Sequence, residues 1–406
     1  MSEWKTYRLE ELCMAKGSYG IGAPAVAFDA NKYTYLRITD INDDGTLNRN
    51  GLMSVDDEHA GDYLLKENDI VFARTGNSTG RSYFYDGRDG ELVYAGFLIK
   101  FSLDSEKVNP RILKYYTHSQ PYYDWVRSFD TGGTRGNINA KVFGAMPITL
   151  PPRHQQDRIV EILKPLDDKI ELNRRINANL EEQAQALFKS WFVDFEPFRD
   201  GPFVDSELGK IPQGWKVTEL GNVTKQKTEK VGQQTTVKVL SPVTAGELVL
   251  SEEYFTKQVF SESIAKYIIV KPNQFAYNPA RINIGSIGRN TFGFDGCVSP
   301  VYVVFECEKG YHYFFDFFRK TDAFKKAVIS RAIGGVRQTL GYKDFALIKV
   351  VYPPENVVRK FNAIYINLLN SQNHHNLENK TLSALRDTLL PKLMSSELSV
   401  KNDYEL

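Results

Sequence analysis

The feature that most constrains this chain is an internal repeat that occupies both of its halves. The stretches that begin at Gly132 and Gly334 share glycines, an arginine, a lysine, a phenylalanine and a Pro-Pro pair at a constant offset of 202 residues. A shorter match joins Trp4-Lys5 to Trp215-Lys216 at an offset of 211. Because a long internal repeat indicates one structural unit used twice, the 406 residues are expected to form two similar halves.

Each half closes with a helical section that follows its Pro-Pro pair. Seam positions there recur at steps of three and four residues, which is the spacing of a heptad pattern. These positions are Ile159, Leu163, Leu166, Ile170, Asn173, Asn177, Leu180 and Leu187 in the first half, and Phe361, Leu368, His375, Asn379, Leu382 and Leu389 in the second. Two stripes at matched positions predict two long antiparallel helices that pack on each other. Pro165 either interrupts the first helix or lies in the first turn of its longer part.

The middle of both stripes is polar. In an antiparallel pair the middle of one helix faces the middle of the other, so Asn173 and Asn177 would lie near His375 and Asn379. Polar residues buried in such a seam cost stability and can fix its register. The alternative is that these side chains are exposed where the centre of the pair loosens.

The larger sections that precede the helices are predicted to have an α+β fold. Runs such as 69–73, 97–101 and 301–305 are rich in β-branched and aromatic residues, and the stretches 112–126 and 311–327 have helical character. The predicted domains are a first α+β domain over 1–152, a helical region over 153–196, a linker and second α+β domain over 197–354, a second helical region over 355–398, and a tail over 399–406.

The sequence shows no catalytic constellation. It has no phosphate-binding loop ending in Gly-Lys-Ser/Thr and no histidine pair at metal-binding helix spacing. The string closest to an amino-methyltransferase loop, Asn278-Pro279-Ala280-Arg281, lacks the second proline and the aromatic residue. Three cysteines without a Cys-x-x-Cys pair indicate reduced thiols, and neither a signal peptide nor a membrane span is expected. We therefore expect a cytoplasmic binding protein with no catalytic site, no metal and no membrane partner.

Two similar modules on a helical spacer suit duplex DNA, whose successive major-groove faces lie about 34 Å apart. A helix of about 36 residues spans roughly 54 Å, which is long enough to hold two modules one DNA turn apart. Modules that match without being identical predict two different half-sites separated by an unread spacer. The same geometry would also suit other elongated partners.

Two loops in each half carry the candidate DNA-contacting side chains: a loop that follows an apolar strand, and a Gly-Gly-x-Arg loop. The candidates are Arg74, Thr75, Asn77, Arg81, Arg135, Asn137, Asn139 and Lys141 in the first half, and Arg281, Asn283, Arg289, Arg337, Gln338 and Lys343 in the second. Arginine and lysine can contact phosphates or guanine edges, and asparagine and glutamine can pair with adenine. The alternative for any one of them is a solvated turn.

The overall net charge of +1 does not argue against DNA binding, because the charge is unevenly distributed. Residues 1–152 carry 17 basic and 20 acidic side chains, whereas residues 205–354 carry 20 basic and 14 acidic ones. The second module is therefore expected to attract phosphate more strongly by itself.

Several stretches resemble the specificity (S) subunit of type I restriction–modification systems. They are PPRHQQDRI at 151–159, LDDKIELNRRIN at 166–177, ALFKSWF at 186–192, ELGKIPQGW at 207–215 and LRDTLLPKLMS at 385–395. The resemblance covers the whole chain in order. The two α+β sections match that family only in architecture.

The resemblance implies a non-catalytic subunit with two target recognition domains joined by two long antiparallel helices. Such a subunit binds a bipartite, asymmetric DNA sequence and recruits two methylation subunits that methylate adenine. With restriction subunits added, the complex cleaves DNA in an ATP-driven reaction. S-adenosylmethionine, ATP and Mg are then expected on the partner chains, with no cofactor in this one, and the target spacer should follow the length of the helices. The alternatives are a single-chain DNA methyltransferase or nuclease with an unfamiliar site, and a pure scaffold.

Overall fold

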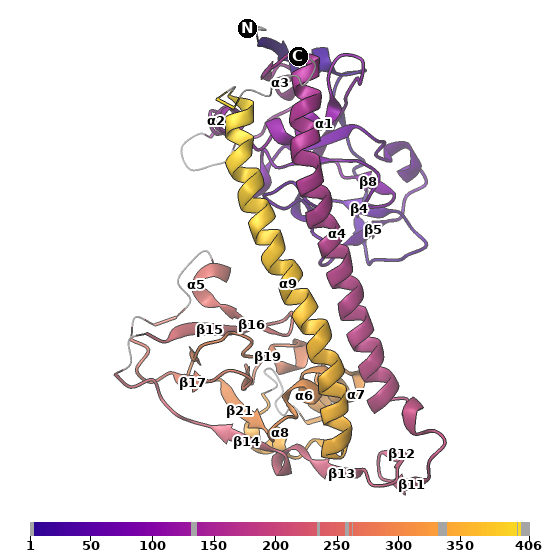
Figure 1. The fold of residues 1–406 in the computed structure, drawn as a ribbon, viewed down its shortest axis with the longest axis vertical. Helices are drawn as coiled ribbons and strands as arrows, with labels where there is room; N and C mark the ends of the chain where they lie inside the picture. Colours follow the sequence, from indigo (N-terminus) through magenta and orange to yellow (C-terminus); the bar gives the residue numbers. More distant parts are fainter. Residues whose placement is uncertain are drawn as a thin grey trace, which may run out of the picture. The chain divides into compact units, whose positions relative to one another are not determined.

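The chain folds into two compact units, each of which contains one α+β domain. The computed structural model describes residues 4–130, 136–233, 236–255, 260–261, 263–331, 339–395 and 397–398. Unit 1 comprises Met1–Arg174 with Asn376–Leu406, and unit 2 comprises Arg175–His375. Two helices of 40 residues, α4 (Arg153–Phe192) and α9 (Glu355–Met394), contribute to both units (Figure 1).

Unit 1 is built on two four-stranded sheets with the orders β2-β9-β6-β7 and β3-β5-β4-β8, and on the antiparallel pair β1-β10. Its elements before α4 are β1 (Lys5–Arg8), η1 (Leu9–Leu12), β2 (Ser18–Tyr19), β3 (Ala25–Val26), β4 (Thr34–Leu36), η2 (Ile38–Asp40), β5 (Met53–Val55), η3 (Ala60–Tyr63), β6 (Asp69–Ala73), η4 (Gly76–Ser78), β7 (Ser82–Phe84), β8 (Leu92–Tyr94), β9 (Leu98–Ser102), α1 (Pro110–Tyr116), α2 (Gln120–Arg127), α3 (Ala140–Gly144) and β10 (Pro147–Leu150).

Unit 2 repeats this plan with sheets of the orders β14-β21-β18-β19 and β16-β15-β20-β17 and the antiparallel pair β13-β22, and it adds the hairpin β11-β12. Its elements before α9 are η5 (Glu196–Phe198), β11 (Phe203–Ser206), β12 (Gly209–Pro212), β13 (Lys216–Glu219), η6 (Leu220–Asn222), β14 (Thr224–Lys227), β15 (Lys238–Val243), β16 (Glu247–Leu250), α5 (Ser251–Tyr254), β17 (Ile268–Val270), β18 (Phe275–Tyr277), η7 (Ile282–Ile284), β19 (Ile287–Arg289), β20 (Gly296–Val298), β21 (Val303–Cys307), α6 (His312–Phe318), α7 (Asp322–Arg331), α8 (Tyr342–Ala346) and β22 (Lys349–Tyr352).

Helices and strands recur in the two units at the offsets of the sequence repeat, which confirms the predicted α+β fold with an internal repeat. Both ends of α1, α3, β10 and α4 recur 202 residues later as those of α6, α8, β22 and α9, and β1 recurs 211 residues later as β13. The predicted strand at 301–305 lies two residues too early, because Val301 and Tyr302 belong to the turn before β21. The helical stretches predicted at 112–126 and 311–327 are each two short helices.

The first long helix contains Pro165 in its interior, so the proline does not lie in a first turn and instead breaks the backbone hydrogen-bond ladder of the helix at one place. Proline removes one backbone hydrogen bond and crowds the carbonyl four residues earlier. Here its ring is exposed to solvent while Leu163 and Asp167 on either side are buried. Packing of the flanking residues therefore holds the helix together across the lost bond.

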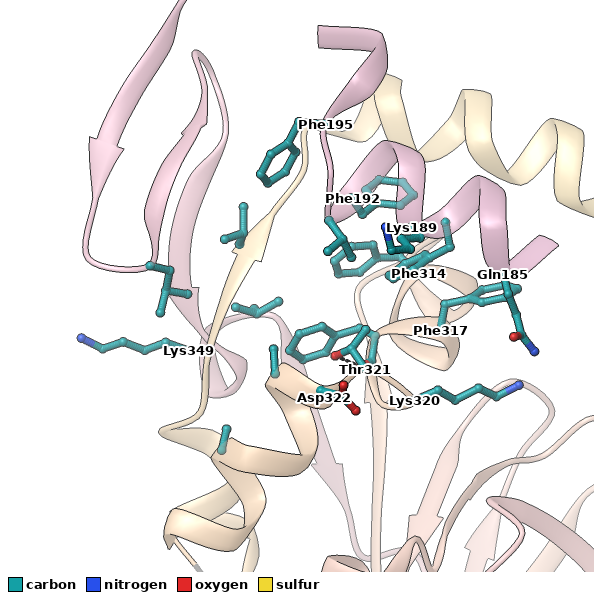
Figure 2. A pocket seen from close by; sticks show the side chains of 18 of the residues that line it. Gln185, Lys189, Phe192, Phe195, Phe314, Phe317, Lys320, Thr321, Asp322 and Lys349 are labelled. Atoms are coloured by element: carbon teal, nitrogen blue, oxygen red, sulfur yellow. Dashed lines mark hydrogen bonds between the residues drawn. The ribbon is translucent and has the colours of Figure 1, made fainter. Parts of the chain in front are cut away.

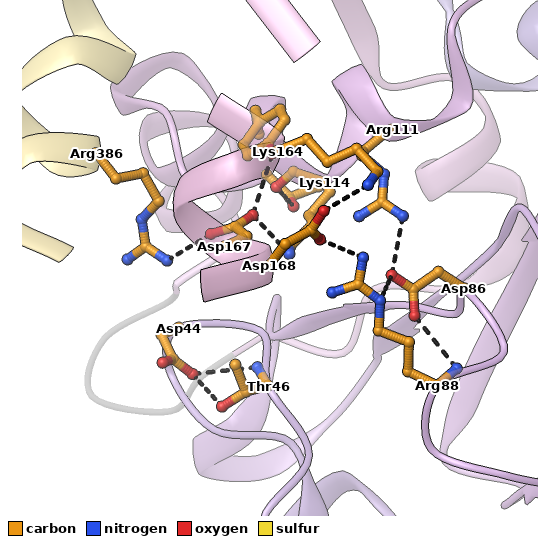
Figure 3. A network of polar contacts seen from close by, with 12 residues as sticks. Asp44, Thr46, Asp86, Arg88, Arg111, Lys114, Lys164, Asp167, Asp168 and Arg386 are labelled. Carbon is orange, nitrogen blue, oxygen red and sulfur yellow. Dashed lines mark hydrogen bonds and ion pairs between the residues drawn. The ribbon is translucent and has the colours of Figure 1, made fainter. Parts of the chain in front are cut away.

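In unit 1 the α+β domain is joined to both long helices by a network of charged side chains (Figure 3). Asp167 on α4 is buried with 6% of its surface exposed. Its carboxylate accepts hydrogen bonds from Lys114 Nζ at 2.8 Å, Tyr115 Oη at 3.1 Å and Arg386 Nη1 on α9 at 3.2 Å. Asp168 beside it pairs with Arg88. One carboxylate thus connects the domain, α4 and α9.

In unit 2 the two helix positions of this network are apolar, whereas the position of Lys114 is taken by Asp316, which pairs with Arg289 and Arg319. The offset of 202 pairs Asp167 with Leu369 and Arg386 with Ala184. Aromatic side chains fill the same place: Phe188 on α4 stacks on Phe317 with ring centroids 5.3 Å apart, and Phe361 on α9 lies edge-on to Phe192 at 5.0 Å. The two halves of the repeat therefore attach similar domains to the helices by different chemistry.

We expect Asp167→Asn to lower the free energy of unfolding of unit 1 by about 3–5 kcal/mol at neutral pH, because Lys114 and Arg386 would lose their buried counter-charge. Burial opposes the charge of Asp167, but Lys114 and Arg386 outweigh it and hold its pKa below the ordinary carboxyl value of 3.8. A carboxyl with a lowered folded-state pKa stabilises the fold above its unfolded pKa. That contribution is lost as the pH falls through the folded value.

Urea unfolding of the wild-type chain and of Asp167→Asn at several pH values measures this effect. The difference between their free energies of unfolding should narrow below about pH 3.8. The matched control is Glu161→Gln on the same helix, whose side chain is 63% exposed and pairs with Arg158 at 3.0 Å. It should cost less than about 1 kcal/mol. Equal effects of the two substitutions would contradict the structural role of the buried network.

In unit 2, Phe361→Ala should lower the free energy of unfolding by about 3–5 kcal/mol, since Phe361 is fully buried among aromatic rings and its removal leaves a cavity. The control is Ile364→Ala on the same helix, which is 41% exposed and should cost far less. Urea unfolding in low and high salt gives a second readout: the loss at Phe361 should not depend on salt, and a strong salt dependence would argue against apolar attachment.

Candidate nucleic-acid interface

The polar centre of the helix pair forms hydrogen bonds within each unit. In unit 1 the Asn173 side chain, fully buried, donates from Nδ2 to Asn379 Oδ1 at 2.9 Å and to Glu378 Oε2 at 2.7 Å. In unit 2 Asn177 Oδ1 lies 2.9 Å from His375 Nδ1. The alternative of a loosened, exposed centre does not hold for Asn173.

The other seam positions differ in how deeply they are buried. Ile159, Leu163, Ile170 and Phe361 are buried, and Leu166, Leu180, Leu187, Leu368, Leu382 and Leu389 are half-buried. The side chains with the least exposure near the ends of the helices include Ala184, Phe188 and Leu393, which belong to the hydrophobic cores of the units. The heptad pattern does not separate these domain-facing residues from the residues between the helices.

In each unit a backbone hydrogen bond joins the segment that follows the Gly-Gly-x-Arg loop to the loop that follows an apolar strand. In unit 1 the amide of Ile138, after the Gly-Gly-x-Arg loop, donates to the carbonyl oxygen of Arg74, which follows β6, at 3.0 Å. In unit 2 the amide of Leu340 donates to the carbonyl oxygen of Pro279, which follows β18, at 3.0 Å. Ile138 and Leu340 are fully buried and occupy equivalent repeat positions. The same loop pair therefore recurs at the end of the same strand.

Most of the candidate side chains that the structure describes lie at the surface of these loops. Asn77, Asn137, Asn139, Lys141, Arg281 and Lys343 are exposed, and Arg74, Thr75, Arg81 and Asn283 are half-buried. Arg135, Arg337 and Gln338 lie outside the described residues.

Two of the candidates also have structural roles. Asn139 is the N-cap of α3, because its Oδ1 accepts a hydrogen bond from the amide of Val142 at 3.0 Å. Arg81 pairs with Asp43 at 2.7 Å and donates to the carbonyl oxygen of Ile41 at 3.0 Å. Lys141 and Lys343, in contrast, occupy the same position on α3 and α8, so both units have a lysine there.

Arg289 is wrong as a DNA contact. Only 7% of its surface is exposed, its Nε lies 2.8 Å from Asp316 Oδ2, and its Nη1 donates to Asn273 Oδ1 at 2.7 Å. Burial opposes ionisation of Asp316, but Arg319 and Arg289 lower its pKa below the ordinary value. Arg289 therefore stabilises the interior of unit 2 and is withdrawn from the candidate interface.

Tyr19 and Phe97 also belong to this surface of unit 1, and the sequence alone did not point to them. The guanidinium carbon of Arg74 lies 5.3 Å from the ring centroid of Tyr19 and 5.7 Å from that of Phe97. These rings are 44% and 55% exposed. Their position beside strand ends is visible in the sequence, but aromatic residues in strands are ordinarily expected in the core.

A cavity of about 900 Å³ lies in unit 2 and is lined mainly by apolar side chains such as Phe192, Phe314 and Phe317 (Figure 2). The lysines that border it, Lys189, Lys320 and Lys349, pair with Asp194, Glu181 and Glu207.

The described residues contain no group of three or more histidine, cysteine or acidic side chains placed to hold a metal ion. None of their helices combines the length and apolar character needed to cross a bilayer. In unit 1, burial, with Arg386 and Lys114, lowers the pKa of His118 to about 4, and its Nδ1 lies 3.1 Å from Tyr123 Oη.

The fold and these sites define a class of protein that the comparisons identify. Residues 1–182 match the family model of the type I restriction modification DNA specificity domain. The chain is 25% identical to the type I restriction enzyme HindI specificity subunit of Haemophilus influenzae, over 98% of this chain and all of that one. It is also 25% identical to the MjaIX specificity subunit of Methanocaldococcus jannaschii, over 71% of this chain and 69% of that one.

A solved structure shares the fold. The type I restriction–modification S subunit from M. genitalium superposes with a TM-score of 0.54 at 15% identity, and 97% of this chain and 96% of that chain are covered. Together these similarities confirm the resemblance to specificity subunits of type I restriction–modification systems. Such subunits are the non-catalytic DNA-recognition component of these systems.

Proposed function

We propose that this chain recognises a bipartite, asymmetric DNA sequence, with each α+β domain contacting one half. The observation that carries the proposal is the recurrence of the same hydrogen-bonded loop pair in both units, Ile138 to Arg74 and Leu340 to Pro279. Both units present exposed basic side chains there, and unit 1 adds exposed amides; such groups can contact phosphates and base edges. Because the side chains differ between the units, the two half-sites should differ.

The distribution of charge supports different shares of phosphate binding. Residues 205–354 carry a basic excess, with 20 basic against 14 acidic side chains, and residues 1–152 carry an acidic excess, with 17 against 20. The second domain would therefore attract DNA more strongly by itself. The first domain would depend more on local basic side chains and on partner subunits.

The long helices would set the spacing of the half-sites and dock two methylation subunits. Their equal length of 40 residues and their hydrogen-bonded centres suit a spacer. Apolar side chains exposed on them, including Leu172, Ile364 and Leu377, offer a surface to a partner. S-adenosylmethionine for adenine methylation, and ATP and Mg for cleavage with restriction subunits, would be held by the partner chains.

Footprinting of the assembled methyltransferase on its target tests the proposal. Protection in two separate segments is expected, and Arg135→Ala and Arg337→Ala should each weaken binding, because each removes a cation from the Gly-Gly-x-Arg loop of one domain. Unchanged affinity of both variants would exclude these loops from the interface.

Two further outcomes would contradict the function itself. If the complex protects no sequence preferentially, the chain is a scaffold. If the isolated chain binds S-adenosylmethionine in a calorimeter, it is an enzyme of an unfamiliar kind. Neither is expected.

A further inference from the structure

Arg74 in unit 1 is held by aromatic rings instead of by a carboxylate. Its guanidinium lies over the rings of Tyr19 and Phe97, at 5.3 and 5.7 Å, a distance at which cation–π attraction acts. We call these three side chains the aromatic clamp. No ion pair to Arg74 is found among the described residues, whereas Arg81 and Arg289 each have a carboxylate within 2.8 Å.

The polar contacts of Arg74 are also incomplete. Its Nε is buried and has no hydrogen-bond partner among the described residues. Its Nη1 is 3.5 Å from Asn137 Oδ1, a long contact to an exposed side chain. A buried donor without a partner is costly and calls for an explanation. A guanidinium that is stacked, half-buried and without a counter-charge is suited to a ligand that accepts hydrogen bonds at its edge.

The clamp is itself fixed to the candidate interface. Tyr19 Oη accepts a hydrogen bond from the amide of Ala140 at 3.1 Å, at the start of α3. Lys141 follows directly on that helix and is exposed. The clamp therefore connects the loop after β6 with the segment that follows the Gly-Gly-x-Arg loop, and its side chains are placed next to a lysine that can contact phosphate.

Unit 2 has a different arrangement at the same place. The last residue of β6, Ala73, pairs with the first residue of β9, Leu98. In unit 2 the last residue of β18, Tyr277, likewise pairs with the first residue of β21, Val303. The residues that follow these two strands, Arg74 and Asn278, therefore correspond to each other. By the same registers Phe97, just before β9, corresponds to Tyr302, just before β21. Tyr19 pairs with Ile99, the second residue of β9, and Lys227 pairs with Val304, the second residue of β21. Tyr19 therefore corresponds to Lys227. No clamp can form there.

The side chains that replace the clamp in unit 2 are engaged within the unit. Asn278 Oδ1 accepts a hydrogen bond from the amide of Ala280 at 3.0 Å, and Lys227 pairs with Glu306 at 2.5 Å. The lysine of the short helix, in contrast, is kept in both units as Lys141 and Lys343. Kept cations suit phosphate, which is the same in every sequence, and a side chain that changes between the halves suits a base.

We propose that Arg74, oriented by Tyr19 and Phe97, is a base-reading residue of unit 1 and that it recognises the major-groove edge of a guanine. This inference rests on the proposed DNA-recognition function. Arginine donates two parallel hydrogen bonds to O6 and N7 of guanine, and this pairing requires a fixed orientation of the guanidinium plane. The rings supply that orientation, and their exposed edges can contact a neighbouring thymine methyl group.

The experiment measures methylation by the assembled complex of this chain with its methylation subunits on a library of DNA targets randomised one base pair at a time. Arg74→Lys keeps the charge but loses the two-pronged donor geometry, so preference for one G·C pair in one half-site should fall by about 5- to 150-fold. Phe97→Ala should reduce the same preference by less. The other half-site should be unchanged.

Matched variants separate the possible causes. Lys141→Gln, in the same unit, should weaken binding to all sequences alike and reduce the salt dependence of binding by about one phosphate. Arg199→Ala, whose side chain is 65% exposed outside both loops, should change nothing. The thermal unfolding midpoint of each variant is measured as a folding control. A midpoint equal to that of the wild type shows that a lost base preference is not a folding defect.

Three results would overturn the inference. Arg74→Lys could leave the base preference unchanged at every position of the target, while the unaltered complex still methylates a bipartite target. Arg74→Ala could weaken all sequences equally, as Lys141→Gln does, which would make Arg74 a phosphate contact. Both results leave the proposed function intact. If the unaltered complex shows no sequence preference, the proposed function fails and the inference fails with it.

Discussion

The attachment of each α+β domain to a stretch of both long helices is the constraint on which the rest of the structure depends. Recognition loops are useful only if their positions are fixed, and loops by themselves are mobile. In unit 1 the buried carboxylate of Asp167 joins Lys114 of the domain to Arg386 of α9. In unit 2 rings from α4, α6 and α9 meet around Phe361. Both solutions bury side chains of the domain against both helices.

The same repeat thus accommodates two kinds of core and two kinds of surface. The pairs β1-β10 and β13-β22 keep both their length and their hydrogen-bonded register. What changes is the chemistry of the side chains at equivalent positions. In the interior, Asp167 of unit 1 corresponds to Leu369 of unit 2. At the candidate interface, Arg74 of unit 1 corresponds to Asn278 of unit 2. A duplicated scaffold with divergent loop residues is what recognition of an asymmetric sequence requires.

Much of the fold could be predicted from the sequence because it depends on periodic patterns. The offset of 202 residues and the steps of three and four in the helical sections are visible without a structure. The choice between the two alternatives for Pro165 was not predictable, because it depends on the packing of the residues that flank an exposed ring. Strand positions near Val301 shifted for the same reason that short strands usually do: pairing partners, and not propensity, set their ends.

The candidate site was predicted less completely, because exposure and pairing depend on tertiary contacts. Arg289 stands in a suitable sequence context, yet Asp316, 27 residues away, draws it into the interior. Tyr19 and Phe97 stand in an unremarkable context, yet they lie at the surface around Arg74. No local pattern distinguishes a charged side chain paired inside a domain from one left at its surface.

The central claim is that two repeated domains recognise two different DNA half-sites. Mapping methylated adenines in a genome that contains this chain and its methylation subunits tests the claim most directly. The account predicts a bipartite motif with two unlike halves and a spacer of fixed length, and the motif should vanish when the gene for this chain is deleted. A continuous motif, or methylation that persists without this chain, would contradict it.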